Sequence, residues 1–142
     1  MRLADVLKQK GSKALTVPES ASVAEAIRTM HKNRVGSVVI PSASGEPVGI
    51  ITERDILRLY AEGKSDFEQL LVKDCMTTGL ILGKPDDRVT EVLAIMTERR
   101  FRHLPVVQEG QIVGVISIGD LVKAELYEAT SEAKALREYI TS

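Results

Sequence analysis

Two short segments of this chain combine a hydroxyl and a carboxyl side chain in a pattern that suits nucleotide binding. Each consists of Gly, two apolar residues, Thr or Ser, two variable residues and Asp; the copies are residues 49–55 and 114–120. If a strand ends at the hydroxyl residue and a helix begins there, the free N–H groups of the first helical turn attract phosphate oxygens. The carboxylate can accept hydrogen bonds from both hydroxyls of a ribose, and the glycine would let a ligand approach the backbone.

The same pattern has a purely structural explanation. Thr52 with Asp55, and Ser117 with Asp120, also have the spacing of a helix N-cap, in which side chain and backbone satisfy each other's hydrogen bonds. The helix dipole favours Asp in the first turn as well. Because a duplication copies a cap as readily as a binding site, both interpretations stay open.

The two segments belong to a repeat that runs through the chain. A shift of 66 residues superimposes Val23 on Val89, and the shift becomes 65 where Gly49 superimposes on Gly114. Each copy predicts the order β-α-β-β-α, because apolar residues recur at helical spacing and are followed by two β-branched runs. A copy of about 60 residues is marginal on its own. We therefore expect an α/β (α+β) fold in which two pseudo-symmetric copies pack as one globule.

The elements and domains that these patterns predict have the following bounds. Short strands are expected at 14–17 and 80–82, helices led by Val23 and Val89, hairpins at 37–40 with 48–52 and at 104–107 with 112–117, and closing helices at 53–61 and 118–128. The predicted division is a first repeat at 1–66 that includes an N-terminal helix, a second repeat at 67–130 and a C-terminal helical tail at 131–142.

Composition narrows the function further. The chain is 44% hydrophobic and 27% charged with a formal net charge of -1, which gives no reason to expect nucleic-acid or membrane binding. Charges near Met1 argue against a secretory signal, so we expect a cytoplasmic protein. The single cysteine, Cys75, and the histidines His31 and His103 lack the spacing of a zinc site, and we expect Cys75 in an apolar slot. No nucleophile beside a base and no paired carboxylates are visible, so an enzyme is not predicted.

The chain resembles tandem CBS-domain proteins, also called Bateman modules, of the free-standing bacterial two-repeat type. The resemblance covers about residues 4–128 and rests on the two segments above, on residues 102–106 and on residues 74–77. It implies a regulatory sensor that binds AMP, ATP or NAD(H) in clefts between the repeats, with no catalytic cofactor and no catalysis. It also implies a homodimer that pairs through its helices, with the helix faces led by Val23 and Val89 as contact surfaces, and an unknown effector protein.

The resemblance also implies a role for individual residues. Asp55 and Asp120 would hold ribose, while Thr52 and Ser117 would contact phosphate or ribose oxygens. Further phosphate donors would be Arg54, Arg102 and His103, because Arg offers a planar fork and protonated His a further donor. Since Arg102 corresponds to Gly36 of the first repeat, the two clefts are expected to differ.

Adenine would lie against strands of the opposite repeat, which supply aliphatic side chains and backbone hydrogen bonds. These walls are predicted at 13–17 and 35–38 for one cleft and at 79–81 and 101–103 for the other. The wall residues selected are Thr16, Val17, Val35, Ser37, Val38, Leu80, Ile81 and Phe101. The alternative hypothesis is a ligand-free dimerisation or scaffold module, in which the motifs only cap helices.

Overall fold

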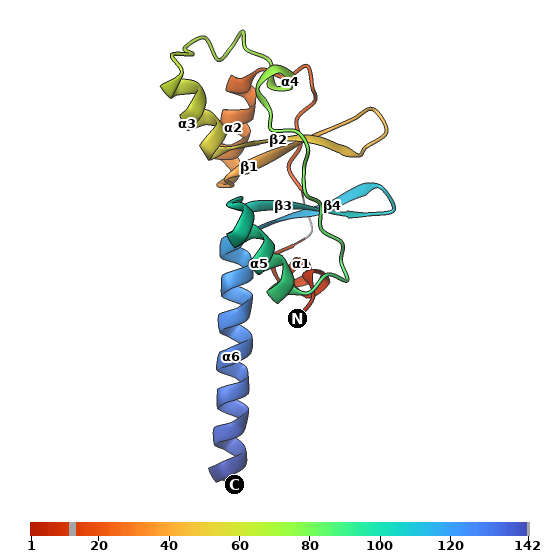
Figure 1. Ribbon diagram of the computed structural model, residues 1–142, viewed down its shortest axis with the longest axis vertical. Coiled ribbons are helices and arrows are strands. Elements are labelled where there is room, and N and C mark those ends of the chain that lie inside the picture. Colours follow the sequence, from red (N-terminus) through yellow and green to blue (C-terminus); the bar gives the residue numbers. More distant parts are fainter. Residues whose placement is uncertain (12–13, 142) are drawn as a thin grey trace.

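Each repeat forms a two-stranded antiparallel sheet flanked by helices (Figure 1). In the first repeat β1 (Ser37–Pro41) pairs with β2 (Pro47–Thr52), and in the second β3 (His103–Gln108) pairs with β4 (Gln111–Ser117). The computed structural model describes residues 1–11 and 14–141. It confirms the predicted mixed α/β class, the two-fold repetition and both hairpins.

Six helices are present in the described part of the chain. The first helix of each repeat ends at an arginine in the left-handed conformation, Arg34 (φ 54°) and Arg100 (φ 58°), so the pseudo-symmetry extends to the helix ends. The closing helix of the first repeat has its predicted bounds. In chain order the helices are α1 (Leu3–Lys10), α2 (Val23–Asn33), α3 (Glu53–Ala61), α4 (Val72–Cys75), α5 (Val89–Arg99) and α6 (Ile118–Thr141).

The short strand expected at 14–17 is reduced to a single parallel bridge, and the one expected at 80–82 is replaced by a single parallel bridge at the next residue. Thr16 bridges to Val39, and Gly83 bridges to Val106. A proline follows each bridge after two residues, and proline has no N–H with which to continue a ladder. These segments therefore lie along the hairpins without becoming regular strands.

Each repeat has its own hydrophobic core, and each core takes up a helix from outside its predicted repeat. In the second core, Leu3, Val6 and Leu7 of α1 pack with residues of α5, β3 and β4. The Leu3 N–H donates to the Asp87 carbonyl at 2.9 Å. Conversely, the first core includes Val72 and Cys75 of α4. α1, which was predicted to belong to the first repeat at 1–66, thus packs on the second repeat, while α4 packs on the first. We call the two repeats interlocked because each core contains a helix from the other predicted repeat.

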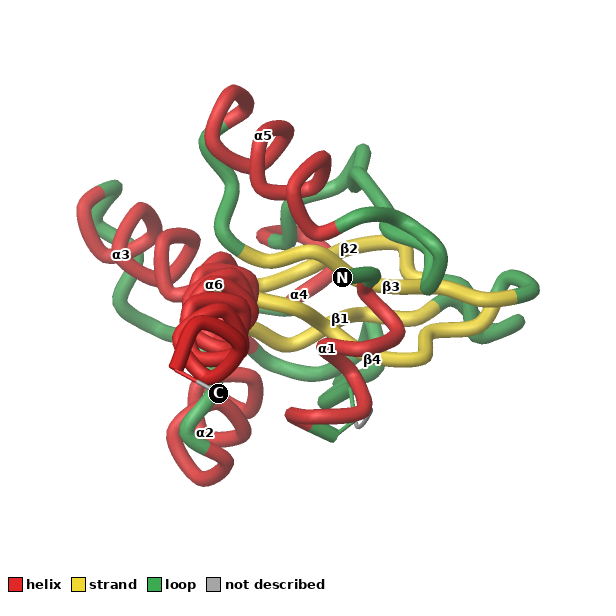
Figure 2. Tube along the Cα trace, turned by 90° about the horizontal axis from the view of Figure 1, so that it is seen from below, coloured by secondary structure: helices red, strands yellow, loops and turns green. Residues whose placement is uncertain are grey.

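α2, α3 and the start of α6 lie toward one end of the strands, and the hairpin turns lie at the other (Figures 1 and 2). α6 is the longest helix and leaves the rest of the molecule (Figure 1). It buries Leu121 and Ala124, whereas every residue at 129–141 is exposed. α6 continues without a break through residue 131, where a separate C-terminal tail was predicted to begin. Within residues 1–11 and 14–141, no helix is long and apolar enough to cross a membrane.

Candidate functional site

The Asp55 carboxylate is held by the first turn of its own helix. Its Oδ2 accepts hydrogen bonds from the Thr52 backbone N–H at 2.9 Å and the Thr52 hydroxyl at 3.1 Å. Its Oδ1 accepts one from the Thr77 hydroxyl at 2.9 Å and a long one from Arg58 at 3.4 Å. The side chain is buried, with the residue 6% exposed. Asp55 therefore caps α3, and a ribose that reached it would have to displace the Thr77 hydroxyl.

Asp120 occupies the equivalent position at the start of α6 and has an additional partner. Its Oδ2 accepts from the Ser117 N–H at 2.8 Å and from the Lys10 ammonium at 2.7 Å. Lys10 also donates to the Val115 carbonyl at 2.6 Å. Burial of Asp120 acts to raise its pKa, but the hydrogen bonds from Lys10 and the Ser117 backbone outweigh burial and lower the pKa. Lys10 thus already occupies the carboxylate that was assigned to a ribose.

A cleft of about 510 Å³ separates the start of α3 from the second repeat, and we call it the Asp55 cleft. Thr52, Arg54 and Asp55 line one side, and the opposite wall carries the predicted residues Leu80, Ile81 and Phe101. Pocket volumes of this order accommodate a mononucleotide. The remaining lining residues are Ile50, Glu53, Leu57, Thr77, Gly79, Arg102, His103 and Pro105.

A second cleft of about 480 Å³, the Asp120 cleft, separates the start of α6 from the first repeat. Ser117 and Asp120 line it, and Val35 and Ser37 of the predicted wall lie opposite. The wall differs from prediction in three other residues. Val17 and Val38 point into the first core, and Thr16 is exposed in its bridge to Val39. Leu15 and Gly36 line the cleft in their place, and Lys13 lies outside the described residues.

Three charged or titratable residues, Glu53, Arg102 and His103, line both clefts. Glu53 and His103 meet at Gly36, where a Cβ atom would lie 2.9 Å from Glu53 Oε1 and 3.0 Å from His103 Cε1. Arg54, the other predicted phosphate donor, donates to the Arg100 carbonyl at 2.8 Å. The clefts thus share a wall in which the Glu53 carboxylate lies beside the basic residues Arg102 and His103. This carboxylate disfavours a ligand with a high negative charge in either cleft.

The shared wall predicts a pH dependence of stability. Burial lowers the pKa of His103, with Arg102 adding to the effect and Glu53 opposing it. Between the ordinary histidine pKa of about 6.5 and this lowered value, the unfolded chain binds more protons than the folded one. Stability therefore falls as the pH drops through that window and is fully present above it.

Urea unfolding between about pH 7.5 and about pH 5.5 measures this effect. We expect the midpoint of the parent protein to fall on acidification and that of His103→Gln to fall less. His31→Gln, at an exposed histidine, is the matched control. Equal falls for parent and His103→Gln would contradict the prediction.

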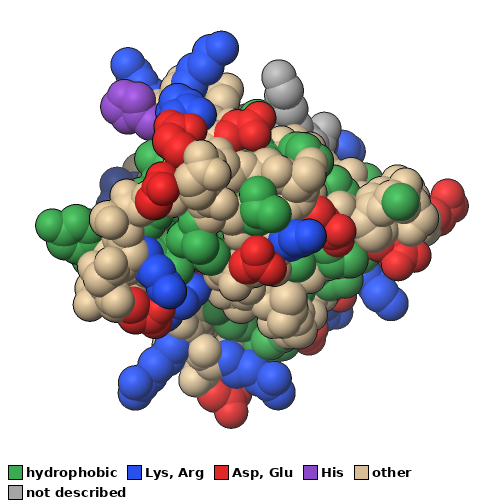
Figure 3. Space-filling view, turned by 90° about the horizontal axis from the view of Figure 1, so that it is seen from above, with side chains coloured by type: hydrophobic (Ala, Val, Ile, Leu, Met, Phe, Trp, Pro, Cys, Tyr) green, Lys and Arg blue, Asp and Glu red, His purple; other side chains and the backbone are tan. Residues whose placement is uncertain are grey.

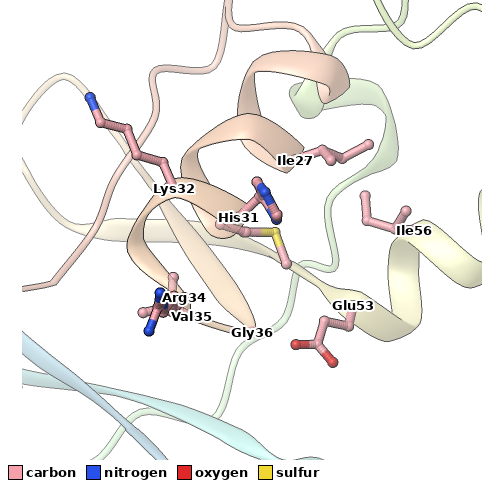
Figure 4. A pocket seen from close by; sticks show the side chains of 9 residues that line it. Ile27, His31, Lys32, Arg34, Val35, Gly36, Glu53 and Ile56 are labelled. Carbon is pink, nitrogen blue, oxygen red and sulfur yellow. The ribbon is translucent and has the colours of Figure 1, made fainter.

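A further groove, of about 710 Å³, lies between α2 and α3 (Figure 4). Ile27 and Ile56 lie on its two sides, and His31 and Lys32 come from the last turn of α2. The groove shares Glu53 and three neighbouring residues at 34–36 with the Asp120 cleft. Since it lacks both hydroxyl–carboxylate pairs, it is a weaker candidate for a nucleotide than either cleft.

Other reactive groups are placed as structural residues. Cys75 is buried in the first core as predicted, and burial raises the pKa of its thiol.

In the part of the chain that the structure describes, no three His, Cys, Asp or Glu side chains are placed to hold a metal ion. Positive and negative side chains are interspersed over the face at the first-repeat end (Figure 3).

Several site residues were missed by sequence reasoning. Thr77 was visible only as part of the 74–77 segment, yet it binds Asp55 and pairs its backbone with Ile50. Its neighbour Met76 fills the space beside Gly49, where a Cβ would lie 2.6 Å from Met76 Cγ. That glycine therefore makes room for a side chain of this protein, not for a ligand as predicted. Lys10 gave no signal at all, because it lies 110 residues from Asp120 in the chain.

Comparison with known proteins agrees with this architecture. The sequence profile of the CBS domain matches residues 5–62 and 72–127, which is most of the chain. The chain belongs to the CBS domain family. Its two CBS repeats are 35% identical over 147 residues to the mitochondrial protein CBSX3 of Arabidopsis thaliana, covering 97% of this chain and 71% of that protein. They also match CBSCBSPB3 of the same plant at 37% identity, but there they span only 23% of the longer protein.

Solved CBS structures superimpose on almost the whole chain. The CBS-domain containing protein ATU1752 from Agrobacterium tumefaciens has a TM-score of 0.83 at 37% identity, covering 88% of this chain and 99% of that one. The CBS domain protein PAE2072 from Pyrobaculum aerophilum, complexed with AMP, has a TM-score of 0.79 at 30% identity, covering 92% and 99%. The chain is thus a CBS pair similar to free-standing bacterial and archaeal ones.

Proposed function

We propose that this CBS pair is a regulatory module that binds an adenine nucleotide between its repeats without converting it. The supporting observation is the layout of the clefts: in each, a hydroxyl–carboxylate pair at a helix start faces apolar residues of the other repeat. These are Leu80, Ile81 and Phe101 in the Asp55 cleft and Leu15 and Val35 in the Asp120 cleft. The AMP complex of the similar protein from Pyrobaculum aerophilum supports the ligand class. The proposal includes ATP and NAD(H) as further adenine nucleotides that the module would bind. We also propose that the protein is located in the cytoplasm.

The Asp55 cleft is the proposed principal site. Its wall of Leu80, Ile81 and Phe101 offers an apolar surface for the faces of adenine, and Arg54 and Arg102 can approach a phosphate. Glu53 in the same cleft repels additional negative charge. We therefore propose AMP as a better ligand than ATP.

Calorimetry with AMP, ADP, ATP, NADH and S-adenosylmethionine tests this proposal. The expected result is saturable binding of AMP, weaker binding of ATP, and no change in either compound after incubation. If no nucleotide binds at about millimolar concentration, the ligand-free scaffold module is favoured instead. Turnover of any of these compounds would overturn the non-catalytic assignment.

The Asp120 cleft is proposed to be the weaker site, because a ligand must first displace Lys10 from Asp120. Lys10→Met leaves the Asp120 carboxylate free, and we expect adenosine, which carries no phosphate, to bind this cleft about 3- to 10-fold more tightly. Calorimetry measures the change. Lys8→Met, at an exposed lysine of the same helix, is the control; equal affinities in the two variants would contradict the expectation.

We also propose that the CBS pair is a homodimer, through a surface other than the predicted one. Val23 and Val89 are fully buried in the two cores and cannot form a contact surface. The apolar side chains that α3 and α5 expose are instead Leu57, Tyr60 and Ile95. A nucleotide that binds one arrangement of such a dimer more tightly than another would increase the population of that arrangement. An effector protein would then recognise the nucleotide-bound arrangement.

A further inference from the structure

The projecting part of α6 carries an apolar seam that no residue within 1–11 or 14–141 covers. Leu126, Leu136 and Ile140 are 63%, 59% and 72% exposed. Thirteen exposed residues, 129–141, extend beyond the rest of the molecule. An unpaired helix of this length is marginal in water, and exposed leucines add to the cost. A stable α6 of the observed length therefore needs a partner along this seam.

The spacing of the seam specifies what kind of partner fits. Its members are Val122, Leu126, Ala129, Ala133, Leu136 and Ile140, separated alternately by four and three residues. Alternation of four and three is the heptad repeat of a coiled coil, with Leu126, Ala133 and Ile140 at the a positions and the others at d. Such a seam packs against another helix with the same period, and a second copy of α6 supplies one.

The charges beside the seam distinguish a parallel from an antiparallel pair. Glu132 lies at a g position and Arg137 at the following e position, which face each other across a parallel pair of identical helices. An antiparallel pair centred on the same seam would place Glu132 opposite Glu132 and Lys123 opposite Arg137. Opposite charges meet only in the parallel pair.

We propose that α6 forms a short parallel coiled coil with α6 of a second copy, and that this pairing fixes the orientation of the dimer. The seam spans about 27 Å, fewer than three heptads, so it must extend an interface that begins on the globular part. There α6 packs beside α5, whose Ile95 is 41% exposed. Because α6 begins in the second repeat, a parallel pair places the second repeat beside the partner's second repeat. Nucleotide binding is not required for this inference.

Disulfide cross-linking of the full chain tests the orientation. In a parallel coiled coil, Ala129→Cys faces its own copy at a distance that suits a disulfide, whereas Ala135→Cys points away from the seam. Both variants keep Cys75, which is buried, and the parent chain measures its background. Under mild oxidation we expect Ala129→Cys to form covalent dimers at least about tenfold faster than Ala135→Cys.

Sedimentation equilibrium provides a second measurement. Leu136→Glu places a charge in the seam without touching either core, so we expect the dimer dissociation constant to rise at least about tenfold with an unchanged circular dichroism spectrum in the near ultraviolet. Arg137→Glu should weaken the dimer, and Glu132→Arg in the same chain should restore it.

The proposal would be overturned by a monomeric parent at micromolar concentration, by equal cross-linking of the two cysteine variants, or by a dimer that Leu136→Glu leaves unchanged. Cross-linking of Ala129→Cys only with Ala133→Cys would show an antiparallel pair and overturn it as well. Calorimetry of the reduced Ala129→Cys variant with AMP separates the two proposals. The cross-linking result tests the coiled coil, and AMP binding to the same variant tests the nucleotide site independently.

Discussion

We expect Asp55→Asn to weaken AMP binding about 10- to 100-fold while the protein stays folded. The expectation follows from the two roles of this carboxylate, which caps α3 and is proposed to accept hydrogen bonds from the ribose. Asparagine keeps one oxygen for the Thr52 N–H that now donates to Oδ2, so the start of α3 is largely retained. It removes the negative charge and replaces one carboxylate oxygen with an amide nitrogen. The two ribose hydroxyls can then no longer both donate to acceptor oxygens of this side chain. Calorimetry gives the affinity, and urea unfolding shows whether the fold has changed.

Asp5→Asn is a matched control for this experiment. Asp5 accepts the Arg2 N–H at 2.9 Å in the same capping geometry at the start of α1, and it lines neither cleft. We expect unchanged AMP affinity in this variant. If Asp55→Asn also binds AMP as the parent does, Asp55 is only a cap, and the ribose contact proposed for it is lost.

We expect Leu3→Ala to lower the free energy of unfolding by about 2–5 kcal/mol. A residue so near the N-terminus would ordinarily lie in a frayed segment and tolerate truncation. Leu3, however, is completely buried in the core of the second repeat. Replacing it with alanine leaves a cavity beside Leu104, whose side chain lies against it near Gly83. Urea unfolding of the full chain measures the loss.

Leu82→Ala is the corresponding control, because Leu82 is 41% exposed. We expect this truncation to cost less than about 1 kcal/mol. Equal losses in the two variants would mean that α1 detaches from the second repeat in solution and that the repeats are not interlocked.

Much of the fold was predictable because its determinants are local. Period-2 and period-3.6 apolar patterns, proline-marked turns and hydroxyl residues three positions before an acid all act within one turn or one hairpin. The bounds of α3 and both hairpins follow from them. The first strand of each repeat was overestimated, because the chain there bridges the neighbouring hairpin at only one residue, Thr16 or Gly83.

The site was predictable only where the repeat itself carried it. Internal symmetry placed Thr52 with Asp55 and Ser117 with Asp120, and the structure brings each pair to a cleft between the repeats. The hydrogen-bond partners of these carboxylates were not predictable. Thr77 and Lys10 reach them from 22 and 110 residues away, over distances in the chain for which no pattern in the sequence provides a signal.

The amino-acid sequence by itself determined the duplication, the order of elements and the two hydroxyl–carboxylate pairs. The duplication follows from the match of the two halves, and the elements and pairs follow from short-range periodicity and turn chemistry. Only the tertiary structure decided that α1 completes the core of the second repeat and that Lys10 covers Asp120. It also decided that Val23 is buried while Leu126 is exposed. All these outcomes depend on which apolar face finds a partner, and that choice is made by packing between segments far apart in the chain.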